Sequence, residues 1–410
     1  MILSHYKLKS KILADRYNSI IFEKGRGRDL YLVGGYIRDI LRGINSPDRD
    51  YVVSGDIISF VNEIRNIIGG TIVKFKKGGM TRLALKDGLT FDFSVPMGIL
   101  KEDLSKRDFT INAIAWSPES KIIDPYNGIE DIKKKRIRSI SEKNIINDPL
   151  RMLRAYRFAA ELNGVIEKNT RKTIKMFNKY IKKSSSERIT LEFFNLLNSP
   201  NSSKYLKMAL TDGLLNNIIL LPNKTLEHNI KEIYLLENRT LIKIPLRIKV
   251  LLNKIISQNL TYKGLLSLQI LLKNGISSKI KMHKIKISKI IRGKIDNAHK
   301  GILKIDKNRK KIERRLFDIF LISKESAIDV LIIKGRLNLI SDYKRFIRIW
   351  KNSFLSSKEI INISKIEKNE KLGKIIKELK KAQFEGRVKN RMNAIKYISC
   401  IFKRISCNKK

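Results

Sequence analysis

The sequence predicts an α+β chain, with a small head that combines a mixed sheet with helices, followed by an all-helical neck, body and tail. Two observations lead to this prediction. Short apolar and β-branched runs alternate with glycine-containing turns between residues 31 and 93. From about residue 201 onward the pattern is helical and basic instead. We therefore expect four parts: a basic N-terminal extension (1–27), a head (28–138), a neck (139–200), and a body and tail (201–410).

The chain is organised around residues 31–50, which read YLVGGYIRDILRGINSPDRD. An apolar strand leads into Gly34 and Gly35, where the backbone can approach a ligand closely and the N–H groups that open the next helix suit a phosphate. If the segment from Asp48 to Asp50 is extended, both carboxylates face the same side and can hold one or two divalent cations. Taken alone, a Gly-Gly pair is usually only a turn and Asp-x-Asp a solvated turn or helix cap. Together they indicate metal-assisted phosphoryl transfer.

The rest of the head is predicted from its periodicity. A helix is expected from Lys7 to Glu23 and another over residues 56–69, where apolar side chains recur at helical spacing. Strands at 71–75, 81–85 and 90–93 form an antiparallel set with hairpin turns at 78–79 and 87–88. Alternation along the last strand places Asp92 on the face of the sheet opposite to that of Phe91 and Phe93. There its carboxylate can lie beside those of Asp48 and Asp50. The alternative is an edge-strand acid that faces water.

The composition points to a polyanionic partner. The chain has 410 residues, enough for several domains, and its 42% hydrophobic content indicates a globular protein. Its 86 Lys and Arg against 39 Asp and Glu give a formal net charge of +47, which favours binding to phosphates. Compositional drift toward Lys, Ile and Asn explains the same excess, and the two explanations are compatible.

The cysteines and the hydropathy predict a reducing, cytoplasmic environment. The two cysteines, Cys400 and Cys407, lie seven residues apart and are expected to be small buried hydrophobes, without a disulfide or zinc site. Apolar runs of membrane-spanning length and a signal-peptide core are not found. An organelle-targeting segment is the alternative, because acids are missing before Asp15.

Four segments in order resemble one family. Residues 31–50 are similar to motif A of the class II tRNA nucleotidyltransferases and bacterial poly(A) polymerases, whose heads are polymerase-β-like. Residues 106–113 (KRDFTINA) resemble motif B, with Lys in place of its first Arg, and residues 147–160 (NDPLRMLRAYRFAA) resemble the Glu-Asp-x-x-Arg motif, with Asn in place of Glu. Residues 185–189 (SSERI) match the next signature, a capped helix in which Glu187 and Arg188 brace the neck.

The resemblance implies a set of site residues and a cofactor. Asp48, Asp50 and Asp92 are the expected catalytic carboxylates, and Asp48 and Asp50 the expected ligands of Mg²⁺. The expected nucleotide-binding residues are Gly34, Gly35, Arg38, Arg107, Asp108, Asn112, Asp148, Arg151, Arg154 and Arg157. Among these, motif B would contribute an arginine that faces phosphates or ribose and an aspartate that accepts from ribose hydroxyls.

Asp148 and Arg151 suggest how a nucleotide is chosen. On a helix, residues three apart are neighbours on one face. A carboxylate accepts from the exocyclic amine of cytosine or adenine and a guanidinium donates to the adjacent ring atom, whereas guanine and uracil present the opposite pattern. An ordinary salt bridge at a helix start is the usual meaning of an isolated pair of this kind. Within the succession of motifs, we interpret the pair as an amino-acid template for C or A.

The remaining segments are expected to have structural or RNA-binding roles. The turn at residues 124–128 resembles the family joint between head and neck, which is treated as a hinge. Many relatives carry a metal-dependent HD phosphohydrolase domain after the neck, but residues 201–410 hold only His228, His283 and His299 and no His-Asp pair, so this activity is expected to be absent. Residues 372–395 resemble the family tail, whose basic helices would hold the tRNA acceptor arm by its backbone, or form a solvated amphipathic helix.

The predicted function is template-independent addition of C, C and A to the 3′ end of tRNA from CTP and ATP. The partners implied are the tRNA acceptor end and these two nucleotides, with no membrane and no DNA. Only Ser94 to Lys106 separates the third carboxylate from motif B, and this shortness is a feature of relatives that add only the two cytidines. CC-only or A-only addition and poly(A) synthesis are therefore alternatives. Outside the class, the alternative is an inactive RNA-binding protein.

Overall fold

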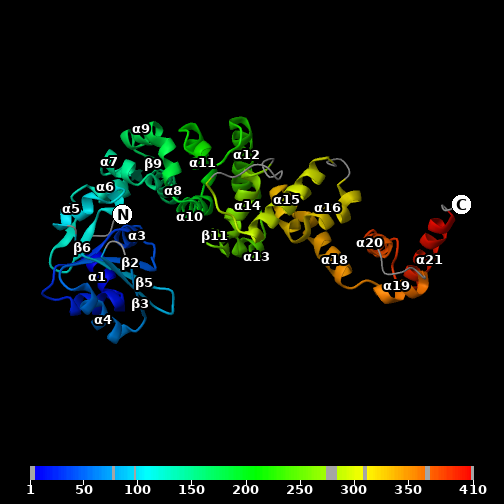
Figure 1. The fold of residues 1–410 in the computed structure, drawn as a ribbon, viewed down its shortest axis with the longest axis horizontal. Helices are drawn as coiled ribbons and strands as arrows, with labels where there is room; N and C mark the ends of the chain where they lie inside the picture. Colours follow the sequence, from blue (N-terminus) through cyan, green and yellow to red (C-terminus); the bar gives the residue numbers. More distant parts are fainter. Residues whose placement is uncertain are drawn as a thin grey trace. The chain divides into compact units, whose positions relative to one another are not determined.

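The computed structural model describes residues 5–75, 79–96, 98–273, 284–307, 312–364 and 370–407. The chain divides into two compact units. The first comprises Met1–Glu227 with Gln258–Leu260 and Lys281–Lys286, and the second comprises His228–Ser257, Thr261–Ile280 and Ile287–Lys410. The first unit contains the sheet of the head and the helices that follow it (Figure 1). The α+β prediction is confirmed.

The head is built on a mixed sheet. Among the described residues it has seven strands in the order β3-β4-β5-β2-β1-β6-β7, and only the β2–β5 pair is parallel. The strands are β1 (Leu30–Val33), β2 (Asp48–Val53), β3 (Thr71–Lys74), β4 (Met80–Ala84), β5 (Thr90–Ser94), β6 (Ala115–Ser117) and β7 (Lys121–Ile123). The three strands predicted after residue 70 pair antiparallel, as expected, while Gly78 of the predicted first turn lies outside the described residues.

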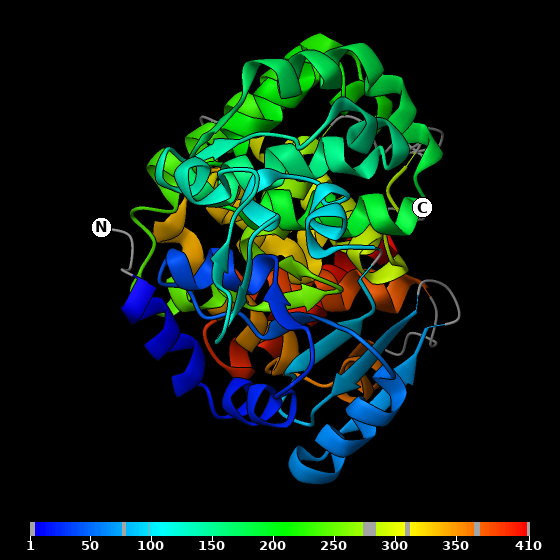
Figure 2. The ribbon, with the colours of Figure 1, turned by 90° about the vertical axis from the view of Figure 1, so that its left-hand side faces the viewer.

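An aromatic core covers one face of this sheet. The Tyr51 ring stacks on Phe93 with 5.2 Å between centroids, and Phe60 of α4 (Ile57–Ile68) meets Phe93 edge-on at 5.9 Å. Phe22 packs on Tyr51 and on Trp116 from the same side. In Figure 2, β1 to β5 and α4 are drawn in shades of blue, and β6 and β7 in cyan. Because side chains alternate along a strand, burying Tyr51 and Phe93 turns Asp50 and Asp92 to the other face.

The predicted helix from Lys7 to Glu23 is in fact two helices. These are α1 (His5–Ala14) and α2 (Arg16–Lys24), and they are separated by Asp15, whose carboxylate accepts hydrogen bonds from the backbone N–H groups of Tyr17 and Asn18. A side chain that caps a new helix start interrupts the preceding helix at that residue. Asp15 also pairs with Arg49 of the sheet, so this segment packs on the head.

Short helices complete the head, and longer ones form the rest of the first unit. The head contains α3 (Gly35–Leu41), α5 (Leu100–Ser105), η1 (Thr110–Asn112) and α6 (Gly128–Lys133). The neck contains α7 (Glu142–Asn147), α8 (Leu150–Leu162), α9 (Lys168–Phe177), η2 (Asn178–Lys183) and α10 (Ser186–Asn198). After it come α11 (Ser202–Thr211), η3 (Leu215–Asn217) and α12 (Asn223–Leu235), and the boundary between the two units falls within α12. Two short strands, β8 (Arg136–Ile137) and β9 (Val165–Ile166), pair in parallel beside α8. As predicted, Ser185 caps α10.

The second unit is helical apart from short strands. Its elements are η4 (Leu236–Thr240), α13 (Leu246–Lys249), η5 (Val250–Asn253), β10 (Ile255–Ser257), α14 (Tyr262–Leu271), α15 (Lys289–Lys307), η7 (Glu313–Arg315), α16 (Leu316–Ser323), η8 (Lys324–Ser326), α17 (Ala327–Ile333), η9 (Leu337–Leu339), α18 (Ile340–Lys351), α19 (Ser357–Ser364), α20 (Glu370–Phe384) and α21 (Arg391–Cys407). The strand β11 (Leu260–Thr261) precedes α14. Among its described residues, one apolar cluster extends over residues 298–346 with Phe384 and another over residues 355–398.

The prediction that both cysteines are buried is wrong for Cys400. Its side chain is exposed on α21, while the side chain of Cys407 lies outside the described part of the chain. The helix packs through Ala394 and Ile398, and Cys400 falls on the opposite side of it.

His283 is also outside the described residues. Within the described ranges, the helices are all too short or too polar to cross a membrane.

Candidate active site

One cavity in the first unit collects nearly all the predicted site residues. Its volume is about 480 Å³, and β2, β4, β5, α3, α8, α10 and the segment before η1 contribute to its wall. Except for Gly34, every residue predicted to act in catalysis or nucleotide binding lines it. The lining residues are Gly35, Tyr36, Arg38, Asp39, Ser46, Asp48, Asp50, Arg82, Asp92, Arg107, Asp108, Asn112, Asp148, Arg151, Arg154, Arg157, Phe158 and Arg188. Residues far apart in sequence, from the head and the neck, thus meet in one place.

Asp48 and Asp50 face this cavity from β2. The residue between them, Arg49, is buried on the other face, where its guanidinium lies over the rings of Tyr36 and Phe91. Asp48 is exposed and accepts a hydrogen bond of 2.5 Å from the Thr90 hydroxyl. The alternation expected for an extended strand is therefore present, and the two carboxylates open onto the same space.

The surroundings make Asp50 less acidic than an ordinary aspartate. Desolvation by the surrounding protein disfavours the charged carboxylate and raises the pKa of Asp50. Arg107 opposes this shift, because its Nη1 lies 3.9 Å from Asp50 Oδ2. The neighbouring carboxylates of Asp92 and Asp48 raise the pKa further. A cation placed among these acids would relieve their mutual repulsion.

The chemistry of Asp48 and Asp50 fits Mg²⁺. This ion takes oxygen ligands and is commonly held by one or two carboxylates together with substrate phosphates. The described residues contain no group of three or more His, Cys, Asp or Glu side chains that could hold a metal, so the structure shows no third ligand beside this pair. The structure therefore offers Asp48 and Asp50 as a pair of ligands. Asp92 lines the same cavity, but its carboxylate is paired with Arg82.

Gly34 supports the cavity without lining it. Its φ is +79°, and a Cβ built on it would lie 2.5 Å from Arg107 Nη1 and 3.3 Å from Asp50 Oδ2. Only glycine combines this left-handed backbone with such a close approach. The residue lets the guanidinium of Arg107 and the carboxylate of Asp50 meet directly above the backbone.

We expect Gly34→Ala to impair the site more than it impairs folding. An alanine here must displace Arg107 from Asp50, so nucleotide binding should weaken by tenfold or more, as measured by calorimetric titration with CTP. The matched control is Gly27→Ala, which has φ +80° and no neighbour within 4 Å of the added Cβ. The control also places an alanine at a positive φ, which costs on the order of 1 kcal/mol, but without a neighbour to displace. Equal nucleotide affinities in the two variants would contradict the prediction.

Asp108 is the centre of a buried network. Asp108 accepts hydrogen bonds from the Phe109 backbone N–H and from Asn112 Nδ2, each 2.8 Å long. It also forms an ion pair with Arg154, whose Nε donates to Asp108 Oδ2 at 2.8 Å. Burial opposes its ionisation, but Arg154, Asn112 and the N–H outweigh burial and lower its pKa. An ionised carboxylate has about four acceptor positions. Three hydrogen bonds occupy most of these positions, and Arg154 Nη2 also lies 2.8 Å from the oxygen that accepts from Arg154 Nε, so a ribose hydroxyl would share that oxygen with Arg154.

Arg38 extends the same network. Its Nη1 donates to Asn112 Oδ1 at 2.5 Å, and its Nε and Nη2 hold Asp39 at 2.9 and 2.8 Å. The guanidinium also lies 4.9 Å from the ring centroid of Phe158. Arg38 is therefore a fixed part of the wall, and its charge is balanced by Asp39.

Glu192 connects α10 to two arginines of α8. It accepts from Arg154 at 2.9 Å and from Arg157 at 2.6 Å, and Arg157 also holds Glu161 at 2.7 Å. Burial alone would lower the pKa of Arg154, but Asp108 and Glu192 raise it above its ordinary value. The Arg157 guanidinium lies 3.9 Å from the Phe158 ring centroid. These contacts fix the neck side of the cavity, a role that the sequence did not indicate for Glu192.

We expect Glu192→Ala to destabilise the first unit by about 3 kcal/mol, because it leaves two arginines partly buried without one of their acids. Thermal unfolding measures this loss. The matched control is Glu161→Ala, which removes a single ion pair from a more exposed carboxylate and should cost less than about 1 kcal/mol. A Glu192 variant as stable as the Glu161 variant would show that the two arginines do not depend on Glu192.

Asp148 and Arg151 lie together, but not on one helix as predicted. Asp148 is extended, with φ −129° and ψ 91°, and follows α7, whereas Arg151 is in the first turn of α8. The intervening Pro149 disfavours a helical conformation at Asp148. Arg151 Nε and Asp148 Oδ2 are 4.0 Å apart, and the other nitrogens of Arg151 donate to the carbonyls of Lys106 and Arg107. These bonds join the neck to the motif B segment.

Arg188 contacts Asp148, one of the two residues predicted to read the base. Its Nη2 donates to Asp148 Oδ2 at 2.8 Å, and it lines the cavity. The sequence predicted that Arg188 braces the neck. Its contact with Asp148 and its place in the cavity wall were not predicted. The carboxylate keeps acceptor capacity, because within the described part of the chain its other oxygen receives a single 3.3 Å bond, from the Leu150 N–H. Spacing in sequence could not identify the contact, since α10 and Asp148 are separated by 40 residues.

Arg82 is a second residue that the sequence analysis missed. Arg82 lies on β4 and donates hydrogen bonds to both carboxylate oxygens of Asp92 on β5, from Nε to Oδ1 and from Nη2 to Oδ2, each 2.6 Å long. Arg82 and Asp92 are register partners, and Asp92 is in turn the register partner of Asp50 on β2. A signal was available, because a hairpin centred on the Asp87–Gly88 turn pairs residues 82 and 92.

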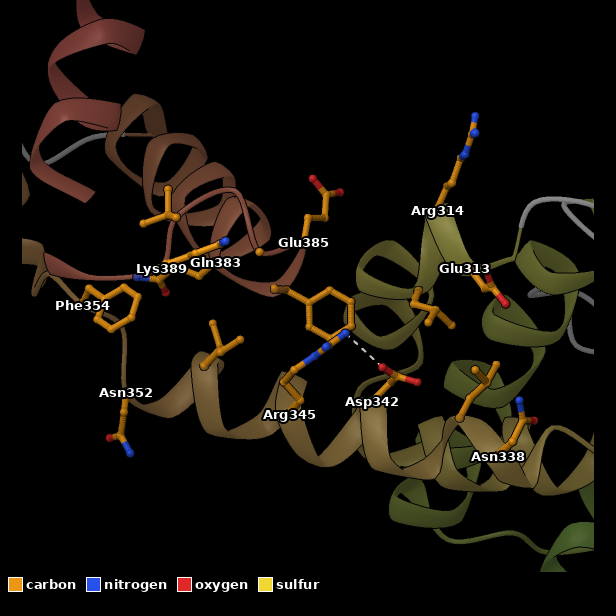
Figure 3. A pocket seen from close by; sticks show the side chains of 16 residues that line it. Glu313, Arg314, Asn338, Asp342, Arg345, Asn352, Phe354, Gln383, Glu385 and Lys389 are labelled. Carbon is orange, nitrogen blue, oxygen red and sulfur yellow. Dashed lines mark hydrogen bonds and ion pairs between the residues drawn. The ribbon is translucent and has the colours of Figure 1, made fainter. Parts of the chain in front are cut away.

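The second unit has a cavity of different character. It has a volume of about 910 Å³ and lies beside α18 and α20 (Figure 3). Figure 3 shows Arg345 pointing toward Asp342, to which it is bonded at 2.9 Å, and the same guanidinium lies 4.7 Å from the Phe384 ring centroid. Of its other acids, Glu385 is held by Arg387. Asp342 and Glu385 come from different segments and are each paired with an arginine, whereas Asp48 and Asp50 lie on one face of a single strand.

Two stretches of the chain match known families. Residues 92–138 match the family described as the poly A polymerase head domain, and residues 165–223 match the family described as the probable RNA and SrmB-binding site of polymerase A. A CC-adding tRNA nucleotidyltransferase of Synechocystis is 38% identical over 189 residues, 45% of this chain and 45% of that protein. A CCA-adding enzyme of Leuconostoc mesenteroides is 34% identical over 209 residues, 46% of this chain and 51% of that protein. The chain thus spans about half the length of these curated relatives.

The fold extends further than the sequence similarity. The solved Thermotoga maritima CCA-adding enzyme, complexed with tRNA, matches with a TM-score of 0.74 at 20% identity and covers 97% of this chain and 98% of that one. The mixed sheet, its two exposed acids and the helical neck define a nucleotidyltransferase fold. More narrowly, the matched stretches of the head and neck are similar to poly A polymerase head and RNA-binding families and to curated tRNA nucleotidyltransferases.

Proposed function

We propose that this protein is a template-independent RNA nucleotidyltransferase that adds C, C and A to the 3′ end of tRNA from CTP and ATP and releases pyrophosphate. One observation carries the proposal: a single cavity holds Asp48 and Asp50 together with Asp148 and Arg151. The first pair suits phosphoryl transfer, and the second can read a base edge. The similarity to relatives named for this activity supports it.

The head provides the reacting end of the pocket. Mg²⁺ held by Asp48 and Asp50 would activate the RNA 3′-hydroxyl and stabilise charge on the α-phosphate. Arg107 lies beside Asp50 and lines the cavity, and with 23% of its side chain exposed to solvent it would offer a guanidinium to the triphosphate. Asp108, Asn112 and Arg38 form the wall that holds this segment in place.

The neck provides the base-reading end. Asp148 would accept from the exocyclic amine of cytosine or adenine, and Arg151 would donate to the neighbouring ring atom. Burial lowers the pKa of Arg151, and Asp108 and Asp148 oppose that shift, so the guanidinium stays charged at neutral pH. Arg154 and Arg157 support this end through Glu192, and they remain candidates for contact with the nucleotide.

The division of labour proposed for the chain follows from this site. Residues 28–138 would form the reacting head and 139–200 the base-reading neck, while residues 201–410 would hold the RNA. The net charge of +47 fits a polyanionic partner. The Thermotoga enzyme of the same fold was solved in complex with tRNA. We propose tRNA as the partner, Mg²⁺ as the metal and the cytoplasm as the location.

Addition of the two cytidines alone is the second candidate. The segment between the third carboxylate and motif B is short, since β5 ends at Ser94 and α5 begins at Leu100. The Synechocystis relative, which is 38% identical, is named as a CC-adding enzyme. In this alternative the head and neck act as described, but the pocket does not change from C to A.

Incorporation assays on three tRNA transcripts distinguish these activities. The transcripts end before CCA, after C and after CC, and each is offered labelled CTP or ATP with Mg²⁺. CCA addition predicts C on the first two and A on the third. Incorporation of C alone indicates a CC-adding enzyme, long A tracts on unrelated RNA indicate a poly(A) polymerase, and no incorporation on any transcript contradicts the proposed function.

A further inference from the structure

Asp92 is the acid of the cavity that is best placed to complete the metal site. It sits on β5, the parallel neighbour of β2, and is the register partner of Asp50. Neighbouring strands bring register partners to the same face of the sheet, so its carboxylate shares the cavity with Asp48 and Asp50. Yet the described residues contain no three-carboxylate arrangement that could hold a metal. The other neighbour of β5 is β4, which carries Arg82 as the register partner of Asp92.

Arg82 occupies both oxygens of Asp92. The two bonds, each 2.6 Å, have the parallel geometry in which a guanidinium recognises a carboxylate. Asp92 is well covered, with 16% of its side chain exposed, whereas Arg82 is 38% exposed and lines the cavity. The arginine can therefore leave toward the open cavity, while the aspartate stays fixed on its strand.

We propose that Arg82 is a positioning residue that competes with the divalent cation for Asp92. With Arg82 paired, the metal site consists of Asp48 and Asp50; once Arg82 turns into the cavity, Asp92 becomes the third ligand. The triphosphate of the incoming nucleotide is the anion that would receive the released guanidinium, because it enters the cavity that Arg82 lines. Arrival of the nucleotide and completion of the metal site are thereby coupled.

The coupling rests on the proposed function, but its test does not need turnover. Binding of Mn²⁺, as a paramagnetic substitute for Mg²⁺, is measured by electron paramagnetic resonance without nucleotide or RNA. Arg82→Gln removes the charge and keeps most of the length of the side chain. Because it releases Asp92 from a charged hydrogen-bonded pair, Mn²⁺ binding should tighten about tenfold or more.

The double-mutant cycle with Asp92→Asn separates competition from general electrostatics. Removing any nearby positive charge favours a cation, and that effect persists when Asp92 has been neutralised. Competition for Asp92 instead predicts that Arg82→Gln changes Mn²⁺ affinity less than about threefold in the Asp92→Asn background. Thermal unfolding of each variant confirms that the folded protein is being titrated.

The outcomes decide the proposal. Tighter Mn²⁺ binding that disappears in the Asp92→Asn background supports it. Unchanged or weaker binding in Arg82→Gln overturns it, and so does an equal gain in both backgrounds. Absence of nucleotide incorporation by the unaltered protein would count against the proposed function alone, because the metal titration involves neither substrate.

Discussion

Replacing Asp48 with asparagine should abolish nucleotide incorporation while leaving RNA binding nearly unchanged. The substitution keeps the shape of the side chain and removes one of the two carboxylates that face the cavity from β2. Electrostatic stabilisation by a bound metal contributes several kcal/mol to such reactions, so we expect a loss of about a thousandfold or more in rate. Single-turnover incorporation of labelled CTP measures the loss.

The accompanying controls test the specificity of this effect. Asp48 is exposed and its hydrogen bond to Thr90 is the contact at risk, so stability should fall by only about 1 kcal/mol. Glu119→Gln, an exposed acid of the head, removes the same charge and should leave the rate unchanged. Filter binding of tRNA should be equal in all three proteins. A rate in Asp48→Asn within a few-fold of the unaltered protein would remove this carboxylate from the mechanism.

Replacing Asp148 with alanine should blur the choice of nucleotide. The carboxylate is the proposed acceptor for the amine of cytosine or adenine, and a hydrogen bond to a charged group is worth about 1.5 to 3 kcal/mol. Discrimination against UTP and GTP should therefore fall by about ten- to a hundredfold, measured as the ratio of kcat/KM values. The proposed catalytic carboxylates, Asp48 and Asp50, are unchanged in this variant, so incorporation itself should persist.

Arg188 provides a comparison for this variant. It donates to Asp148 at 2.8 Å from α10, and 54% of its side chain is exposed, so its removal should disturb the fold little. If Arg188 holds Asp148 in the reading position, Arg188→Ala should lower discrimination in the same direction but less strongly. Unaltered nucleotide preference in Asp148→Ala would refute the base-reading role, whatever the result for Arg188.

Local patterns in the sequence predicted much of the head. The alternation of Asp48, Arg49 and Asp50 predicted two carboxylates on one face, and the structure places Arg49 in the core and both acids in the cavity. Helix α4 and the three strands after it also follow from periodicity and turn residues. The helix predicted over residues 7–23 was wrong because Asp15 starts a new helix through its own side-chain bonds.

The sequence by itself determined which residue types and local elements the site would use, because periodicity and turn chemistry act over a few residues. Only the tertiary structure decided which charges meet. The contacts of Arg82 with Asp92, Arg188 with Asp148 and Glu192 with two arginines join different elements of the chain. Ion pairs of this kind depend on strand register and helix packing, and many acids and bases compete for each partner in a chain with 125 charged side chains, 86 basic and 39 acidic. The fold resolves that competition by bringing particular pairs within hydrogen-bonding distance.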